Sequence, residues 1–258
     1  MRALLAFFTA EAEAGLFGWG VFAGLALSHL PLPIARYDFL LLWCLGLQAW
    51  MMLSGRERGR EIAIVAAFHL LGLGLEMYKV RYGSWSYPES AVTKVLDVPL
   101  YSGFMYASVA SYMMNARRTL NLRFHGVPAA PMLVLGTGAI YANFLLARRF
   151  GDVRGWILAG LALLLWPMRV EFDWNRKRTR MPILVALTLI GFFVFLAENV
   201  CTALGAWVYP HQAAGWQPVE MGKIVSWILM STVALLVITL MGGFGREAAR
   251  RRRPVAAV

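Results

Sequence analysis

Long apolar stretches, separated by short polar loops, follow one another along the whole chain. A helix crosses the roughly 30 Å of hydrocarbon in a bilayer with about 20 residues. Continuous apolar runs favour helices over barrel strands, in which apolar and polar residues alternate. The pattern predicts eight membrane-spanning helices, at about 16–31, 38–54, 61–80, 98–116, 129–147, 155–171, 182–202 and 221–243.

The composition also indicates a membrane protein. Hydrophobic residues make up 59% of the 258 residues and charged residues 15%, and the mean hydropathy is +0.59. A soluble domain is nearer to half apolar and a quarter charged. We therefore expect an all-α polytopic membrane bundle. No long polar insertion divides the chain, so residues 1–258 are expected to form a single membrane domain, and the first 14 residues do not resemble a cleavable signal peptide.

Lysine and arginine are distributed unequally between the two sets of alternating loops. The set that includes both termini holds 17 of them, and the other set holds 8. Basic residues favour the cytoplasmic side, so both termini are expected in the cytoplasm, although Arg148, Arg149 and Arg154 oppose this bias. The net charge of +11 comes largely from these loops and from the basic tail at 246–258. Anionic lipid headgroups are its expected partner, and nucleic acid is not.

One constellation of five residues occurs twice in the chain, 122 positions apart. Its members are Glu76, Gly83, Trp85, Tyr87 and Pro88 in the first copy, and Glu198, Gly205, Trp207, Tyr209 and Pro210 in the second. An offset of four expected helices makes the repeat parallel, with halves at about 1–122 and 123–245. Both copies are then expected at the outer ends of their helices, on the same side of the membrane.

Each copy places a carboxylate inside an apolar stretch. Glu76 follows LLGLGL, and Glu198 follows FFVFLA. A carboxylate at such a depth costs a few kcal/mol unless it is protonated, paired or turned toward a polar cavity. We predict acid–base roles for both. The alternative is structural: Glu76 pairs with Lys79 or Arg81, and Glu198 caps a neighbouring helix.

Three further polar residues are predicted to join these carboxylates in a pocket under the motif loops. His69 lies two helical turns before Glu76 and shares its helix face. Asn199 adjoins Glu198, and Asn143 lies within the fifth expected helix. For His69, an ordinary hydrogen bond between helices is the competing interpretation.

The motif aromatics have two interpretations. Trp85, Tyr87, Trp207 and Tyr209 suit the aromatic belt at a membrane interface, which accounts for the residue types alone. The constant distance to the glutamate instead predicts a loop that folds back over the carboxylate and contributes to substrate binding. Such a loop shields a buried acid from water, as protonation of a double bond or hydroxyl requires.

Two acidic residues precede the fourth and eighth expected helices. Asp97 stands before Val-Pro-Leu, and Glu220 follows Pro218-Val219. Capping and the helix dipole account for acids and prolines at helix starts. Both side chains are also candidates for acid–base roles, because this arrangement points them toward the same outer vestibule as the motifs.

Several signatures of metal and nucleotide sites are absent from the sequence. It holds no HExxH, CxxC or Walker sequence and no aspartate-rich diphosphate motif, so neither a metal nor a cofactor is expected. Glu171 and Asp173, flanked by arginines, are interpreted as a solvated helix end with ion pairs. Cys44 and Cys201 are expected to be packing residues.

The runs GSWSYPE and VPLYSGFMYASVASYM resemble an uncharacterised bacterial membrane family, the domain of unknown function numbered eight hundred and seventeen. This resemblance implies the inner (plasma) membrane and supplies no activity. The order of Glu76, a glycine-containing turn, Tyr87 and Val98-Pro99-Leu100 is more weakly similar to carotenoid hydratases and bacterial lycopene cyclases. That similarity implies protonation of a polyene. Gly-Ser-Trp replaces the Pro-Phe-Gly turn of the hydratases, and the acidic pair of the cyclases is absent.

Three hypotheses for function remain. The first is a membrane enzyme with acid–base chemistry on a lipophilic, isoprenoid- or carotenoid-like substrate. The second is a transporter for a small solute, which parallel repeats and intramembrane carboxylates also suit. The third is a non-catalytic membrane scaffold whose motifs serve only as anchors.

Overall fold

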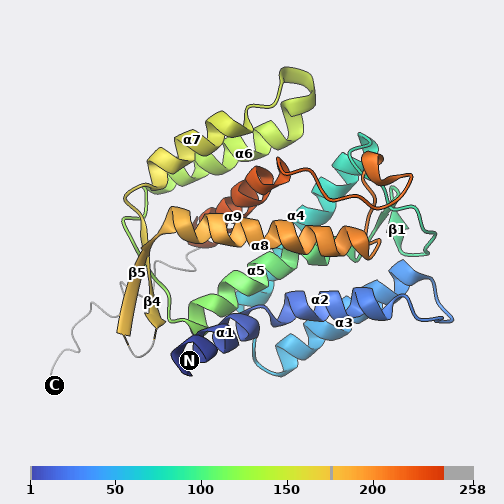
Figure 1. Cartoon of the computed structure of the whole chain (residues 1–258), viewed down its shortest axis with the longest axis horizontal. Coiled ribbons are helices and arrows are strands. Elements are labelled where there is room, and N and C mark those ends of the chain that lie inside the picture. Colours follow the sequence, from blue (N-terminus) through green and yellow to red (C-terminus); the bar gives the residue numbers. More distant parts are fainter. Residues whose placement is uncertain (1, 175–176, 241–258) are drawn as a thin grey trace. The chain divides into compact units, whose positions relative to one another are not determined.

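The computed structural model describes residues 2–174 and 177–240 (Figure 1). The basic tail at 246–258, for which lipid headgroups were the predicted partner, lies outside these residues. The described part holds nine α-helices. They are α1 (Arg2–Ala14), α2 (Leu16–Leu27), α3 (Arg36–Leu53), α4 (Arg60–Arg81), α5 (Ser102–Thr119), α6 (Ala130–Phe150), α7 (Arg154–Leu165), α8 (Ile183–Ala203) and α9 (Lys223–Leu240).

Helices α2 to α9 occupy the eight apolar stretches of the sequence. Of the helices in the described part, α4, α6 and α8 are long and apolar enough to cross a membrane by length and composition, whereas the apolar segments of α2, α7 and α9 are shorter. The prediction of a helical membrane protein is thereby confirmed at the level of class. The number of eight crossings stays a prediction.

Helix α1 was not expected from the hydrophobic pattern. It packs against α5, where the Tyr112 hydroxyl donates to Glu11 over 2.9 Å. Glu13 forms an ion pair with Arg56 over 3.0 Å. The acidic residues of this N-terminal segment therefore bind partners from other parts of the chain.

The chain divides into two compact units. Of the described residues, unit 1 comprises 2–120 and Phe193–Met221, and unit 2 comprises 121–174, 177–192 and 222–240. Helix α8 contributes its first part to unit 2 and its last part to unit 1.

In unit 1, α5 packs against α1, α2 and α4. Two glycines permit the close approach of α4 and α5. A Cβ at Gly72 would lie 2.4 Å from the ring of Tyr106, and a Cβ at Gly103 would lie 2.6 Å from the carbonyl oxygen of His69. Small residues at such contacts are typical of helix pairs in membranes.

A short hairpin corrects the predicted start of the fourth helix. Strands β1 (Lys94–Val95) and β2 (Val98–Pro99) pair antiparallel, and α5 begins only at Ser102, not at residue 98. The turn between the strands is formed by Leu96 and Asp97, both with positive φ. Two consecutive residues in this conformation end any helix, so Val98 and Pro99 belong to a strand.

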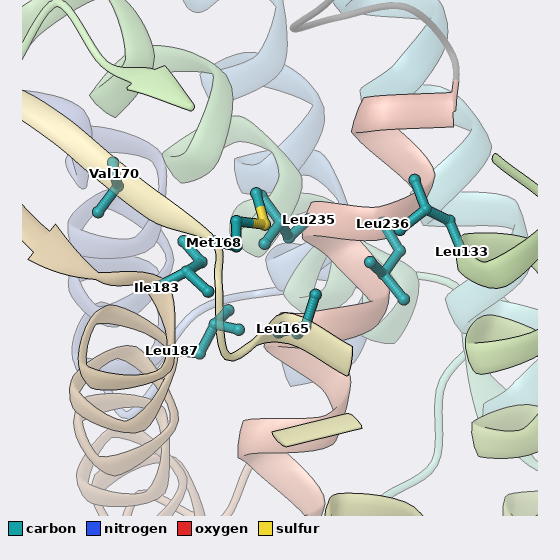
Figure 2. Close-up of a cluster of buried hydrophobic side chains, with 8 residues drawn as sticks. All are labelled: Leu133, Leu165, Met168, Val170, Ile183, Leu187, Leu235 and Leu236. Carbon is teal, nitrogen blue, oxygen red and sulfur yellow. The ribbon is translucent and has the colours of Figure 1, made fainter. Parts of the chain in front are cut away.

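In unit 2, α6 packs against α7 and α9. Side chains from these helices, from α8 and from the strand region form one buried cluster (Figure 2). Its members are Leu133, Leu165, Met168, Val170, Ile183, Leu187, Leu235 and Leu236. The cluster joins the helices of this unit to its sheet.

That sheet has the strand order β3 (Arg123–His125), β4 (Arg169–Trp174) and β5 (Lys177–Pro182). Helix α7 ends at Leu165, so the expected span of 155–171 was too long, and the expected helix end at Glu171 and Asp173 is a strand. Apolar residues alternate here, with Val170 and Phe172 buried. The predicted ion pairs are present, because Glu171 binds Arg180, and Asp173 pairs with Arg178 over 3.4 Å.

Candidate functional site

The two motif copies adopt the same backbone conformation at the ends of α4 and α8. Gly83 and Gly205 have φ angles of +66° and +65°, a left-handed conformation that glycine adopts at little cost. Each glycine follows a helix and closes it with two backbone hydrogen bonds of the same pattern. These are Gly83 N–H to Val80, Ser84 N–H to Lys79, Gly205 N–H to Thr202 and Ala206 N–H to Cys201, all of 2.9–3.0 Å.

The motif loops also pair with each other within unit 1. Ser86 and Val208 exchange two backbone hydrogen bonds of 2.9 Å each, in an antiparallel bridge. The two residues are 122 positions apart and therefore equivalent in the two copies. An antiparallel bridge between equivalent residues creates a local two-fold relationship between the loops.

Glu76 is buried, with 4% of its surface exposed, and accepts hydrogen bonds from three aromatic side chains. Trp85 Nε1 donates to its Oε2 over 2.6 Å, and the Tyr87 hydroxyl donates to the same oxygen over 2.8 Å. The Tyr106 hydroxyl, from α5, donates to Oε1 over 2.8 Å. The first motif loop therefore folds back over its own carboxylate.

Glu198 is buried to a similar degree, with 2% exposed, and accepts a hydrogen bond from the Tyr209 hydroxyl over 2.5 Å. This contact matches that between Tyr87 and Glu76. Trp207 differs from Trp85, because its side chain hydrogen-bonds to Tyr209. The second loop thus follows the first in its tyrosine and departs from it in its tryptophan.

Aromatic residues bring the two carboxylates into one cluster in unit 1. The rings of Trp85 and Tyr209, one from each copy, meet edge to face with centroids 5.9 Å apart. Trp85 donates to Glu76, and Tyr209 donates to Glu198. The cluster therefore contains one carboxylate from each motif.

The loop tyrosines remain hydrogen-bond donors at physiological pH. Burial, reinforced by the adjacent Glu76 carboxylate, raises the pKa of Tyr87 well above its usual value of 10.0. Burial and Glu198 likewise raise the pKa of Tyr209. Ionising either phenol would place a second negative charge beside a carboxylate in a dry environment.

Arg36 holds the second motif in place. Its side chain is only 11% exposed, and its Nη1 pairs with Glu89 over 2.6 Å, one residue beyond the first motif. The same nitrogen donates to the Gly205 carbonyl over 3.2 Å, and Nη2 donates to the Leu204 carbonyl. These two carbonyls directly follow the end of α8 at Ala203, where a cation also complements the helix dipole.

Tyr101 and Lys94 add two further supports. The Tyr101 hydroxyl donates to the Ala206 carbonyl over 2.5 Å, inside the second motif. Lys94 Nζ donates to the Tyr87 carbonyl over 2.9 Å, inside the first. The residues around the hairpin therefore position both loops.

His69 has a different environment from the one predicted. Its ring packs on Phe104 with centroids 4.3 Å apart. Within the described residues, its Nδ1 is buried and has no hydrogen-bond partner. The predicted interhelical hydrogen bond is therefore absent at this nitrogen, because the Gly103 backbone and the Phe104 ring occupy the space beside it.

The two asparagines stabilise loops and do not contact the carboxylates. Asn143, in unit 2, donates to Asp152 over 3.1 Å and accepts the Val153 N–H over 2.9 Å. Asn199 donates to the Phe195 carbonyl over 2.9 Å and accepts the Val219 N–H over 2.9 Å. Their amides therefore bind loop backbone and helix groups within their own units, and their place in a pocket with the carboxylates stays a prediction.

Asp97 and Glu220 are both exposed, and neither lies in the first turn of a helix. Asp97 is in the β1–β2 turn, and Glu220 is in the loop before α9 begins at Lys223. The capping roles considered for them are therefore wrong. Neither side chain hydrogen-bonds within the part of the chain that the structure describes.

Sequence reasoning missed three residues of unit 1. Tyr106 and Arg36 act across helices, so their spacing along the chain carries no signal. Glu57 is only 1% exposed and accepts hydrogen bonds from Gln48 Nε2 and Ser111 Oγ, both of 2.5 Å. The burial of Glu57 was not predicted because arginines surround it in the sequence, and an acid among basic residues usually forms an ion pair at the surface.

No group of three or more His, Cys, Asp or Glu side chains in the described ranges is arranged to hold a metal ion. The clustered groups of unit 1 are carboxylates, phenols and an indole. This set can accept and donate protons or hydrogen bonds within an apolar bundle.

Comparisons with known proteins identify relatives of this chain. The family described as "Protein of unknown function (DUF817)" matches residues 3–235. The uncharacterized protein YoaT of Bacillus subtilis (strain 168) is 43% identical over 230 residues, which cover 88% of this chain and 87% of YoaT.

Two solved structures have a similar fold. The mycobacterial Insig homologue MvINS from Mycobacterium vanbaalenii matches with a TM-score of 0.50 and 16% identity, over 75% of this chain and 98% of that chain. A cross-linked MvINS trimer matches with a TM-score of 0.50 and 17% identity, over 78% and 100% of the two chains. At this identity the likeness concerns the fold alone.

Proposed function

This chain belongs to the DUF817 family of proteins of unknown function, and from the geometry of its buried carboxylates we propose that it is a membrane enzyme. Its reaction is acid–base chemistry on a lipophilic, isoprenoid- or carotenoid-like molecule. The carrying observation is that Glu76 and Glu198, both buried, each accept a hydrogen bond from the tyrosine of their own motif.

The two carboxyl groups have unequal surroundings, which suits separate acid and base roles. Glu76 is bound by Tyr106, whereas Ile228 occupies the corresponding position of the second half. One carboxyl group, in its protonated form, donates a proton to a substrate double bond, or to a hydroxyl that then leaves as water, and a carbocation results in either case. The other group, in its ionised form, removes a proton from that cation. Return of this proton to the first carboxylate restores the enzyme. The substrate gains and loses one proton, so charge balances over the cycle.

The aromatic side chains supply an apolar and partly polar wall for this chemistry. Trp85 and Tyr87 bind Glu76, Tyr209 binds Glu198, and Trp207 binds Tyr209. The phenols can orient the carboxylates or relay protons. A water-poor site strengthens each of these hydrogen bonds and protects a reactive cation from hydrolysis. Glu76 and Glu198 are thus the catalytic residues of this proposal, and the four aromatics contact the substrate.

Expression in a bacterial host followed by extraction of lipids and pigments tests the proposal. The wild type should change the extracted profile, and both Glu76→Gln and Glu198→Gln should abolish that change. Glutamine preserves the shape and can still accept hydrogen bonds, so a loss reports the missing proton chemistry. Glu13→Gln, which removes a surface carboxylate paired with Arg56, is the matched control.

Two outcomes would reject the enzymatic role. One is a wild-type profile in both carboxamide variants at equal protein level. The other is an equal loss in the Glu13→Gln control at wild-type stability, which would show that the change in profile does not depend on the two buried carboxylates. Thermal unfolding of each purified variant measures folding independently.

The architecture that we propose for the enzyme has eight crossings in a single membrane domain. It has two parallel four-helix repeats, at about 1–122 and 123–245, and both termini lie in the cytoplasm of an inner (plasma) membrane. The corresponding bounds of α4 and α8, offset by 122 residues to within one position, support the repeat. Reporter fusions at residues 56 and 121 should report the cytoplasm, and fusions at residues 90 and 152 should report the outside.

Glu57 favours a second candidate, transport of protons or a small solute. This buried carboxylate precedes α4, and Glu76 lies near the end of the same helix. Ionisable groups near both ends of a spanning helix are typical of ion pathways. Gln48 and Ser111 donate hydrogen bonds to Glu57, and in this proposal they hold it at one end of the pathway.

Proteoliposomes that contain a pH-sensitive dye distinguish this candidate from the enzyme. An imposed membrane potential should drive proton uptake through the wild type, and Glu57→Gln should reduce it at least several-fold. Glu13→Gln should leave uptake unchanged. A flux equal to that of empty liposomes would reject transport of protons.

A further inference from the structure

The tip of the β1–β2 hairpin has a backbone conformation that its residues do not favour. Leu96 and Asp97 have φ angles of 51° and 62°. Two consecutive positive values are typical of a type I′ turn, for which Asn-Gly and Asp-Gly are preferred. Aspartate tolerates this region, whereas leucine does so at a cost. Strain of this kind persists only where the surroundings hold it, and it concentrates at functional positions.

The base of the hairpin is firmly held. The Asp38 carboxylate, in the first turn of α3, accepts the Thr93 N–H over 2.9 Å and the Thr93 hydroxyl over 2.5 Å. Lys94 Nζ donates to the Tyr87 carbonyl over 2.9 Å. Strand β2 also contacts both α3 and α4. These contacts fix the base of the hairpin and thereby the position of its tip.

Three apolar side chains of the hairpin segment are exposed: Leu96 in the turn beside Asp97, Val95 in β1, and Val92 at the base, where Asp38 accepts its N–H. Val92 is 92% exposed, Leu96 is 69% exposed and Val95 is 45% exposed. Turns that face water are usually polar, built from glycine, asparagine, aspartate and serine. A leucine that is strained and 69% exposed gains nothing from contact with water, which points to an apolar partner outside the protein.

The position of the hairpin along α4 identifies that partner. Helix α4 has the length and composition of a membrane-crossing helix and ends at Arg81. Tyr78 and Tyr82 lie at this end with ring centroids 4.6 Å apart, and Tyr82 is exposed. Aromatic residues at the end of a crossing helix are typical of the membrane–water boundary. The hairpin follows this end of α4 in the chain and its base is bonded to the first turn of α3, an arrangement that suits the level of the lipid headgroups.

We propose that the exposed apolar side chains of this hairpin segment, Leu96, Val95 and Val92, insert into the headgroup layer and the first acyl carbons of the bilayer. Asp97 keeps its carboxylate at the level of water, which limits the insertion to a shallow depth. Lys94 joins this lipid contact to the first motif loop, and so places the loop over Glu76 at a defined height relative to the membrane. The proposal depends on the membrane class of the protein and not on its acid–base activity.

Spin labelling tests the proposal in the full chain, reconstituted in phosphatidylcholine nanodiscs. Leu96→Cys carries a nitroxide, and the native thiols Cys44 and Cys201 are buried, which favours labelling at the new site. Collision of the label with oxygen, which concentrates in lipid, is compared with collision with a water-soluble nickel chelate. Leu70→Cys, exposed within α4, calibrates the lipid phase, and Ser90→Cys, exposed before the hairpin, calibrates water.

The oxygen-to-nickel ratio at Leu96→Cys should exceed that at Ser90→Cys several-fold and approach that at Leu70→Cys. A ratio equal to that at Ser90→Cys would overturn the proposal. Val92→Cys carries the same expectation, so a poorly folded Leu96→Cys protein does not prevent a decision. A water-like ratio at Val92→Cys would then count against insertion in the same way.

Discussion

Ser86 and Val208 pair through two backbone hydrogen bonds of 2.9 Å although 122 residues separate them. They are the central residues between the tryptophan and the tyrosine of the two motif copies. Their pairing accompanies the edge-to-face contact of Trp85 with Tyr209, and so joins the surroundings of one carboxylate to those of the other. A change in either motif loop should therefore affect both carboxylates.

Replacing Tyr106 with phenylalanine should lower the free energy of unfolding by roughly 1–3 kcal/mol, because buried Glu76 loses one of its hydrogen-bond donors. Tyr141→Phe is the control, since that hydroxyl has no hydrogen bond within the described residues and should change stability by less than about 0.5 kcal/mol. Denaturant titration of purified protein in detergent measures both. Equal effects of the two substitutions would show that the Tyr106 contact contributes little.

A methyl group at Gly72 should destabilise the pair of α4 and α5 by roughly 1–3 kcal/mol. The added Cβ would lie 2.4 Å from the Tyr106 ring, whose hydroxyl binds Glu76. At Gly74, two residues further along the same helix, a Cβ meets nothing within 4 Å, and alanine there should be neutral or slightly stabilising. Unfolding titrations of Gly72→Ala and Gly74→Ala compare them directly, and a neutral Gly72→Ala would mean that the ring shifts freely.

Arg36→Lys should cost about 1–3 kcal/mol despite keeping the charge. Arginine binds Glu89 and the two carbonyls that follow α8 at once, and an ammonium group does not reproduce this planar fork. Arg60→Lys provides the reference, because Arg60 is exposed and has no side-chain partner among the described residues. The comparison of unfolding midpoints contradicts the prediction if the two substitutions prove indistinguishable.

Leu96→Gly should raise the free energy of unfolding in detergent by about 1 kcal/mol, since glycine adopts a positive φ without strain. The neighbouring Val95→Gly, in strand β1, should instead lower it by roughly 0.5–1 kcal/mol through lost backbone restriction. Opposite signs are the expected result. A loss of stability in both would indicate that the Leu96 side chain packs within the folded protein.

The Asp152 carboxylate should make stability depend on pH in the acid range. Arg154, through its side-chain hydrogen bond, lowers the pKa of Asp152 to about 2, below the value of about 3.9 in an unfolded chain. The ionised carboxylate therefore stabilises the folded state above about pH 4, and this contribution is lost as the pH falls toward 2.

Because the Asp152 side chain is 35% exposed, screening keeps the effect of this pair below about 1 kcal/mol. Unfolding of the wild type and of Asp152→Asn, measured from pH 7 to pH 2, should show a difference that narrows with acidity. A difference that is constant over this range would assign the effect of the substitution to packing or to the Asn143 contact.

Local pattern predicted most of the helices, and it failed where non-local contacts compete. The eight apolar stretches became helices α2 to α9. The segment at 166–174 did not continue α7, because β4 finds partners on both sides, in β3 and β5. Helix α1 was missed because its acidic residues Glu11 and Glu13 resemble a solvated terminus until Tyr112 and Arg56 are placed beside them.

The candidate site was predicted in part for the same reason. The carboxylate and the tyrosine of each motif lie eleven residues apart, across a helix end and its glycine turn, so their contact follows from local geometry. Asn143 and Asn199 were grouped with them on polarity alone, and the structure shows their amides bound to loop and helix groups. A polar residue in an apolar stretch is expected to have a hydrogen-bond partner, but the sequence does not identify that partner.

The amino-acid sequence by itself determined the helical membrane class and the two glutamates under aromatic loops. Hydrophobic length and residue spacing are properties of neighbouring residues, and the bilayer and the helix period convert them directly into structure. Only the tertiary structure decided that Tyr106 binds Glu76, that Arg36 closes α8 and that Ser86 meets Val208. These contacts join segments far apart in the chain, and close packing of whole helices selects them.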